Sequence, residues 1–380
     1  MKNRSSILTV FLPILCICGC LLLAGCGLGK EAAVTVSDRA VSHEEEFGGV
    51  YIDLAIDDFN ALGFAYGDSV DVSFSNGYTL TDVPYYNGYY TQIGEPLLVA
   101  YPGYPYIKAC VNSGGDLWDT AGLSDTDTAE ITLSEQGKYL DIQSARDISY
   151  KDDRSQFASD AVFANFRSVN VGGLKENVLY RSASPCDNQH NRAAYTDALI
   201  AAAGVNCIVN LSDTEEKLQK YINEEGFASP YFLSLYEDGK VIPLALNMNF
   251  SSEDFRSRLV SGLIAMSEHE GPYLVHCTEG KDRTGFVCML LEALCGAGYQ
   301  EIVDDYMITY DNYYGITEAD DPDRYEVIVE TLLIPMLESV VGDDSVDLTT
   351  ADLSEFAERY LLDNGMNNEQ LAALISKLRR

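Results

Sequence analysis

The chain has 380 residues, a length that allows two folded domains. Hydrophobic residues make up 47% of it and charged residues 22%, which excludes a chain that is disordered over most of its length. Its 25 lysines and arginines stand against 59 aspartates and glutamates, which gives a formal net charge of -34. Because nucleic acids and anionic lipid surfaces are bound through clustered basic residues, we expect no nucleic-acid partner.

The first 25 residues have the layout of a secretory signal. Lys2 and Arg4 precede an apolar run from Ile7 to Leu23, and small residues follow before Cys26. The sequence LAGC at 23–26 resembles the lipobox of bacterial lipoproteins, which implies cleavage before Cys26 and lipid attachment to its sulfur. The alternative is an uncleaved transmembrane helix. Either way, we expect the rest of the chain to be extracytoplasmic and anchored to the cell membrane.

The cysteines after position 26 show neither zinc-site spacing nor a redox pair. We expect no metal or other cofactor, and we expect these cysteines to be buried as small apolar side chains rather than joined in disulfides. They are Cys110, Cys186, Cys207, Cys277, Cys288 and Cys295.

The first half of the chain predicts a spacer and then a small all-β domain. Residues 26–46 are polar and lack periodicity, which is typical of a linker. Residues 47–150 contain strand and turn patterns, such as the alternating stretch GDSVDVSFSNG at 67–77 and the apolar strand at 94–101. Their many tyrosines either line a sugar or peptide groove or cover strand surfaces.

This β-rich region resembles the C-terminal barrel domain of the S-adenosylmethionine hydroxide adenosyltransferases. The similarity runs from about Gly48 to Gly122 and includes GGVYIDLAIDDF and VNSGG. It implies a barrel fold and no activity, because the other domain of that family has no counterpart in this chain.

Residues 157–380 predict an α/β domain in which strands alternate with helices. Strands are expected at 178–182, 205–212 and 273–276, with helices at 192–203 and 252–270. The apolar stretch that begins at Arg283 predicts a buried helix. The loop between strand 273–276 and this helix therefore lies at the carboxyl end of a strand, where α/β sheets bind ligands.

That loop, HCTEGKDRTG, has the chemistry of a phosphate site. Cys277 and Arg283 are separated by five residues, and Gly280 permits a tight turn between them. A loop that curls into a helix N-terminus directs its backbone N–H groups at a tetrahedral anion, and the same groups stabilise a thiolate. Arg283 can grip two phosphate oxygens. A thiolate below a bound phosphate is a nucleophile aimed at phosphorus.

The loop resembles the signature of the cysteine-dependent tyrosine and dual-specificity phosphatases, in a bacterial subgroup with a Lys-Asp pair before the arginine. Two further stretches support the resemblance, FANFRSVNVGGLKENVLYRSASP at 163–185 and IVDDYMITYDNYY at 302–314. The likeness runs from about Ala164 to the C-terminus. It implies a central sheet flanked by helices and hydrolysis of phosphoric monoesters.

The resemblance implies a role for each loop residue. Cys277 is the nucleophile that forms a phosphocysteine, Arg283 binds phosphate, and His276 is a supporting neighbour. Many relatives carry a general acid about thirty residues before the cysteine, but residues 242–252 lack one here, so Asp282 is the first candidate and Asp213 the second. The residues expected to surround the substrate are Thr278, Glu279, Gly280, Lys281 and Thr284.

The expected substrate is a phosphotyrosine-type monoester, with phosphoinositides or inositol phosphates as the alternative. Lys281 favours the second class, whereas Glu279 and the negative charge of the chain oppose polyanions. Arg167 and Arg181 are either secondary anion contacts or structural ion-pair partners. Two other functions stay open, namely a catalytically silent module that binds phosphorylated ligands, and a β-rich domain that binds a cell-wall or peptide ligand.

Overall fold

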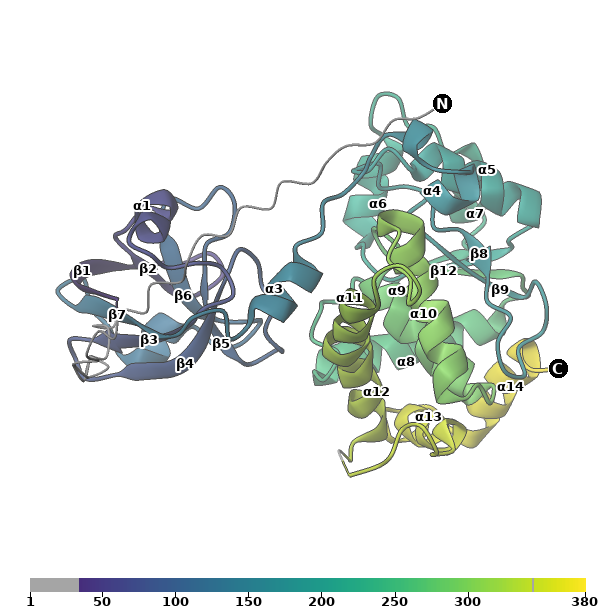
Figure 1. Cartoon of the computed structure of the whole chain (residues 1–380). Coiled ribbons are helices and arrows are strands. Elements are labelled where there is room, and N and C mark those ends of the chain that lie inside the picture. The colour runs from purple at the N-terminus through teal and green to yellow at the C-terminus, as the bar shows by residue number, and fades with distance from the viewer. Residues whose placement is uncertain (1–33, 344) are drawn as a thin grey trace, which may run out of the picture. The chain divides into compact units, whose positions relative to one another are not determined.

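The computed structural model describes residues 34–343 and 345–380 (Figure 1). The expected signal segment 1–25 and the lipid-bearing Cys26 lie outside the described residues. Within the described ranges, no helix combines the length and the apolar character that crossing a membrane requires.

The N-terminal part is a closed barrel in the strand order β1-β2-β6-β5-β4-β3-β7. Neighbouring strands are antiparallel except β4 and β5, which are parallel. Alternate apolar residues such as Val70, Val72 and Ile131 point into its core. The elements are β1 (Thr35–His43), β2 (Val50–Ile52), α1 (Ile56–Ala61), β3 (Ser69–Phe74), β4 (Thr79–Tyr86), β5 (Pro96–Val99), β6 (Ile107–Val111), α2 (Leu117–Ala121) and β7 (Thr128–Glu135), followed by α3 (Leu140–Arg146).

The expected spacer at 26–46 is wrong for its second half, because β1 lies there and pairs with both β2 and β7. The strand carries an irregularity between Val36 and Arg39, and Asp38 has a φ of 56°. Val36 and Val41 are both buried although five positions separate them, so the register shift conceals the alternation in the sequence.

The C-terminal part is built on a five-stranded sheet in the order β11-β10-β12-β9-β8, parallel except for β8. Its strands are β8 (Arg167–Ser168), β9 (Leu179–Ser182), β10 (Cys207–Asn210), β11 (Val241–Pro243) and β12 (Tyr273–His276). Its helices are η1 (Arg154–Gln156), α4 (Asp160–Phe163), α5 (Ala193–Ala203), α6 (Glu215–Ile222), α7 (Pro230–Glu237), α8 (Glu253–Glu268), α9 (Asp282–Leu294), α10 (Tyr299–Tyr314), α11 (Pro322–Ile328), η2 (Val329–Leu333), α12 (Ile334–Val341), α13 (Leu353–Asp363) and α14 (Asn368–Leu378).

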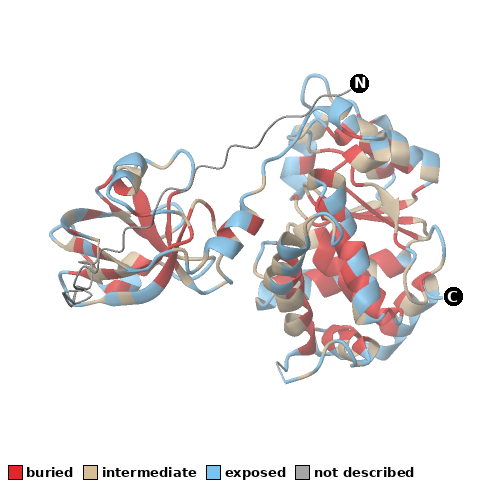
Figure 2. Ribbon diagram, in the orientation of Figure 1, coloured by how far each residue is buried: buried red, intermediate tan, exposed pale blue. Residues whose placement is uncertain are grey.

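Helices cover both faces of this sheet. Ile208 and Leu274 pack against α5, α6 and α7, whereas Val209 and Val275 face the larger cluster that α8, α9 and the C-terminal helices form. Every residue of α9 from Thr284 to Leu294 is buried (Figure 2). The predicted α/β fold, its buried helix and the preceding small β domain are confirmed. The six cysteines among the described residues, five in this part and Cys110 in the barrel, are free and buried, as expected.

Candidate active site

The segment 277–281 connects the end of β12 to the start of α9. Cys277, its first residue, is buried at 4% exposure. The strand therefore brings the thiol to the carboxyl edge of the sheet, in the loop that leads into the N-terminus of a buried helix.

The backbone carbonyls of this segment accept hydrogen bonds from groups around the loop. The Thr278 carbonyl accepts from the Ser184 amide at 3.0 Å, and the Glu279 carbonyl accepts from the Tyr313 hydroxyl at 2.7 Å. These donors come from the segment after β9 and from α10, so two separate parts of the domain fix the loop.

The Gly280 carbonyl is held by two side chains. The Asn165 amide and the Arg181 guanidinium each donate to it at 3.1 Å. At one end of the segment the Cys277 carbonyl lies 3.0 Å from Nδ1 of His276. At the other end the Lys281 carbonyl accepts from the Gly285 amide at 2.6 Å.

All five carbonyls from Cys277 to Lys281 thus accept hydrogen bonds. Among the described residues, by contrast, the backbone N–H groups of Thr278 to Arg283 have no hydrogen-bond acceptor. The unpaired N–H groups of the loop do not face the residues that bind its carbonyls. Together with the first N–H groups of α9, they form the positive end of the helix dipole. This arrangement is an anion-binding cradle.

Gly280 is required by both its conformation and its neighbours. Its φ is +71°, and a Cβ at this position would lie 2.2 Å from the Ser182 carbonyl oxygen. Any other residue would push the loop off β9 or change its course. The expected role of Gly280 in shaping the turn therefore has a direct steric basis.

Asp305 of α10 supports the loop indirectly, because it pairs with Arg181, which donates to the Gly280 carbonyl. Its carboxylate pairs with Arg167 at 3.0 Å and with Arg181 at 2.7 Å, and Arg181 is 1% exposed. Burial opposes ionisation of Asp305, but the two guanidinium groups outweigh this effect and hold the pKa of the carboxyl well below its usual range. Arg167 and Arg181 are consequently structural ion-pair partners, one of the two alternatives left open by the sequence.

Arg283 and Thr284 follow the loop at the start of α9. One Nη1 hydrogen of Arg283 is donated to the Leu246 carbonyl at 3.0 Å. The Arg283 Nε and the Thr284 hydroxyl are buried, and neither has a hydrogen-bond partner among the described residues. Unpaired buried donors are costly, so their presence beside the cradle points to a bound group that would accept from them.

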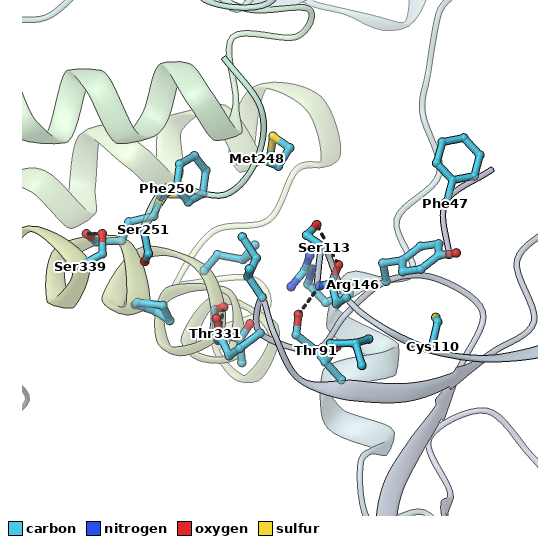
Figure 3. A pocket seen from close by; sticks show the side chains of 18 of the residues that line it. Phe47, Thr91, Cys110, Ser113, Arg146, Met248, Phe250, Ser251, Thr331 and Ser339 are labelled. Atoms are coloured by element: carbon cyan, nitrogen blue, oxygen red, sulfur yellow. Dashed lines mark hydrogen bonds between the residues drawn. The ribbon is translucent and has the colours of Figure 1, made fainter. Parts of the chain in front are cut away.

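The segment between β11 and α8 contacts the start of α9 through its Leu246 carbonyl, which accepts from Arg283. Figure 3 shows Met248 and Phe250 on it. The Phe250 ring stacks on Phe286 of α9 at a centroid distance of 5.0 Å, while Met248 is 40% exposed. The segment from Leu244 to Ser252 contains no aspartate or glutamate.

The two candidate acids have different surroundings. The Asp282 side chain is 29% exposed, and its Oδ1 lies 3.3 Å from Nζ of Lys281. Asp213 is 2% exposed, and its Oδ2 accepts hydrogen bonds from the Asn210 amide and the Ser212 hydroxyl, both at 3.0 Å. Asp282 is therefore the more exposed of the two carboxyl groups, whereas the Asp213 carboxylate is buried and accepts two hydrogen bonds.

His276 is fully buried at the end of β12. Burial lowers its pKa to about 4, and the nearby positive charge of Arg283 acts in the same direction. The imidazole is therefore neutral near pH 7 and supports the Cys277 carbonyl rather than supplying a positive charge. In the part of the chain that the structure describes, no group of three or more His, Cys, Asp or Glu residues could hold a metal ion.

Residues 163–380, more than half of the chain, match the tyrosine phosphatase family. Two solved structures are similar at low identity. The core catalytic domain of the PP-IP phosphatase SIW14 from S. cerevisiae, in complex with citrate, is 18% identical, with a TM-score of 0.26 and coverage of 43% of this chain and 83% of that one. TpbA from P. aeruginosa is 19% identical, with a TM-score of 0.22 and coverage of 42% and 84%. None of the curated proteins matches the chain. By the family match, the chain belongs to the tyrosine phosphatase family and is a phosphatase.

Proposed function

We propose that the protein hydrolyses phosphotyrosine-type monoesters through a phosphocysteine intermediate on Cys277. The single observation that carries this proposal is the orientation of the loop, in which five consecutive carbonyls are held by the protein and the amides from Thr278 to Arg283 are left to bind an anion. Cys277, the first residue of this loop, supplies the thiolate that attacks the phosphorus of the bound phosphate.

In the first step, the Cys277 thiolate forms a bond to phosphorus as the bond to the ester oxygen breaks. The leaving oxygen takes the proton of Asp282, so the alcohol or phenol departs neutral. Arg283 and the loop amides stabilise the charge on the three equatorial oxygens. The Thr284 hydroxyl, which has no partner among the described residues, is available to Sγ when this sulfur later becomes the leaving group.

In the second step, a water molecule attacks the phosphocysteine. Asp282, now a carboxylate, takes a proton from this water, and the S–P bond breaks to return the thiolate and release inorganic phosphate. Asp282 is preferred over Asp213 as the acid because its side chain is partly exposed, whereas the Asp213 carboxylate is buried and accepts two hydrogen bonds.

We further propose that this chemistry takes place outside the cytoplasm on a lipid-anchored protein. The support is the sequence alone, namely the signal-like segment 1–25 and the lipobox that ends in Cys26. Radiolabelled palmitate should enter the wild-type protein in cells and should not enter a Cys26→Ala variant. Equal labelling of the two would contradict the anchor.

The full-length protein in detergent, with EDTA present, should release phosphate from a phosphotyrosine peptide. Cys277→Ser should abolish this release while leaving the thermal midpoint close to that of the parent. A phosphoserine peptide, a phosphatidylinositol phosphate and phytate should be poorer substrates. Turnover that survives in Cys277→Ser would contradict the mechanism, and a preference for phytate would establish the inositol phosphate alternative. Binding without hydrolysis would identify a silent module.

A further inference from the structure

A histidine from the segment between β9 and α5 lies between two carboxylates, one of which belongs to the loop 277–281. Nδ1 of His190 lies 3.0 Å from Oδ1 of Asp152, and its Nε2 lies 3.3 Å from Oε1 of Glu279. Glu279 is the second residue after Cys277, so its side chain starts from the loop whose amides form the proposed phosphate cradle. The His190 side chain is only 12% exposed, which limits how far water can replace these contacts.

The geometry around His190 decides the charge of its ring. A neutral imidazole has one N–H donor and one lone pair, whereas an imidazolium donates from both nitrogens. Both ring nitrogens of His190 face a carboxylate oxygen, so a neutral ring would turn a lone pair toward one of these oxygens. The hydrogen bond to Glu279 raises the pKa of His190, and the charges of Glu279 and Asp152 add to this effect against the opposing effect of burial. The site therefore stabilises the imidazolium.

The other titratable groups near His190 leave this balance in place. The Arg192 guanidinium donates to the Asp152 carboxylate at 3.2 Å and to the His190 carbonyl at 3.4 Å. The positive charge of His190 also acts on Asp187, where it opposes the rise in pKa that burial causes. The Tyr150 ring lies 5.0 Å from the imidazole, and burial raises the pKa of its hydroxyl to about 12, so it adds no charge near pH 7.

Glu279 would oppose the binding of an anion unless its charge were compensated. Its Oε2 accepts a hydrogen bond from the Tyr150 hydroxyl at 3.1 Å, which orients the side chain but leaves its charge unchanged. The lysine of the loop, Lys281, pairs with Asp282 at 3.3 Å. Among the described residues, His190 is the one side chain that forms an ion pair with Glu279. Loss of the imidazolium charge would leave an uncompensated carboxylate on the loop that has to accept a phosphate dianion.

We propose that His190 is a positioning residue, which as an imidazolium binds and neutralises Glu279 and so allows the loop 277–281 to accept a phosphate dianion. His190 acts through Glu279 and does not itself contact the substrate. This inference rests on the proposed function and adds a control of substrate affinity by pH. Because the pKa of His190 is raised, its charge is present at lower pH and is lost only above the ordinary value of about 6.5. Anion binding should therefore weaken on the alkaline side.

Calorimetric titration with tungstate, a tetrahedral dianion, measures binding at the loop without turnover. The full-length parent, His190→Gln, Glu279→Gln and the double variant are compared between about pH 6.5 and about pH 9. The parent should lose about threefold to tenfold in affinity over this range. His190→Gln should bind weakly at both ends of the range. Glu279→Gln should bind tightly at both ends, because it lacks the charge that His190 compensates.

His269→Gln is the matched control. In the part of the chain that the structure describes, the ion pairs of histidines involve His43 and His190 but not His269. This variant should therefore follow the parent over the whole pH range. A loss of affinity as large as that of His190→Gln would overturn the assignment of the effect to His190.

The double variant separates compensation of charge from a structural role. If His190 acts through Glu279, His190→Gln should change the affinity little in the Glu279→Gln background. The same loss in both backgrounds, or the same pH dependence in the parent and in Glu279→Gln, would overturn the proposal. Where the thermal midpoint shows that His190→Gln does not fold, the comparison of the parent with Glu279→Gln still decides.

Hydrolysis of a phosphotyrosine peptide by the same proteins distinguishes this inference from the proposed function. The alkaline loss should appear in KM, with kcat little changed. Tungstate binding that follows the expected pattern without any phosphate release would overturn the proposed function and leave the role of His190 standing. Phosphate release by a parent whose tungstate affinity does not depend on pH would overturn the role of His190 alone.

Discussion

The side-chain amide of Asn165 donates a hydrogen bond to the backbone carbonyl of Gly280, 3.1 Å away and 115 positions along the chain. The contact joins the segment just before β8 to the middle of the loop 277–281, where Arg181 donates to the same carbonyl. The proposed phosphate cradle is therefore shaped by residues outside the loop as well as by the loop itself, and we expect changes in either to affect catalysis.

Replacement of Gly280 by alanine should strongly impair activity. The new Cβ would lie 2.2 Å from the Ser182 carbonyl oxygen, so the loop must move, and we expect kcat/KM to fall by about a hundredfold or more. Gly204→Ala is the matched control, because Gly204 has a similar φ of +66° and no atom lies within 4 Å of the Cβ position. The control should lose about 1–2 kcal/mol of stability and keep its kcat/KM. Equal kinetics for the two variants would contradict the steric argument.

Removal of the Tyr313 hydroxyl should lower kcat/KM by more than the loss of folding stability accounts for. Tyr313→Phe leaves the Glu279 carbonyl without its donor, and an unpaired buried acceptor costs about 1–3 kcal/mol. We expect kcat/KM on an aryl phosphate to fall by roughly tenfold. Tyr360→Phe removes a buried hydroxyl that has no hydrogen-bond partner among the described residues, and it should be close to neutral in both kinetics and stability. A similar kinetic loss in both variants would argue against a specific role for Tyr313.

Neutralising Asp305 should destabilise the α/β domain. Asp305→Asn leaves the buried Arg181 and the nearby Arg167 without their carboxylate, and breaking a buried ion pair costs about 3–5 kcal/mol. Asp321→Asn disturbs an exposed pair with Arg324 at 3.7 Å, so it should cost less than about 1 kcal/mol. Urea unfolding of both variants measures the difference. A loss below about 1 kcal/mol for Asp305→Asn would show that the network does not depend on this charge.

The buried imidazole of His276 should make the protein less stable in mild acid. Its pKa is about 4 in the folded protein, whereas a histidine in an unfolded chain titrates near pH 6.5. As the pH falls below about 6.5, the unfolded state takes up a proton that the folded state rejects, so stability declines until about pH 4, by up to about 3 kcal/mol. The free energy of unfolding, measured between pH 7.5 and pH 5 for the parent and for His276→Gln, tests this. The variant should show a shallower decline, and parallel curves would contradict the prediction.

The proposed catalytic loop can be predicted from the sequence because its chemistry is local. Cys277, Arg283 and the glycine between them stand within seven consecutive residues, and the strand and buried helix that flank them have clear patterns. The holders of the loop carbonyls, Asn165 and Tyr313, come from distant segments. Their stretches carry part of the family resemblance, but the sequence pattern does not show which atoms these two side chains bind.

The barrel shows a different limit of sequence reasoning. Strand alternation correctly predicts β3 and β5. The sequence predicts a spacer where β1 lies, because the irregularity at Asp38 shifts the buried positions of this strand. Closure of the barrel, with β4 parallel to β5, depends on pairing between strands rather than on any local signal. The position of Tyr150 beside Glu279 is likewise a long-range contact.

The role of Asp282 should depend on the leaving group. Asp282→Asn should slow hydrolysis of phenyl phosphate, whose leaving oxygen needs a proton, by about a hundredfold or more. The same substitution should slow formation of the phosphocysteine from p-nitrophenyl phosphate much less, because p-nitrophenolate leaves without taking up a proton. Equal losses on the two esters would argue against Asp282 as the acid and return attention to Asp213.

The most direct test of the central claim is to trap the phosphocysteine. Asp282→Asn should accumulate it from p-nitrophenyl phosphate, since cleavage of the ester needs no acid there but attack by water still needs the base. Rapid quenching followed by mass spectrometry of the digested protein should place one phosphoryl group on the peptide that contains Cys277, and none in the Cys277→Ser, Asp282→Asn double variant. A phosphoryl group on another residue, or turnover by the double variant, would contradict a phosphocysteine mechanism at this loop.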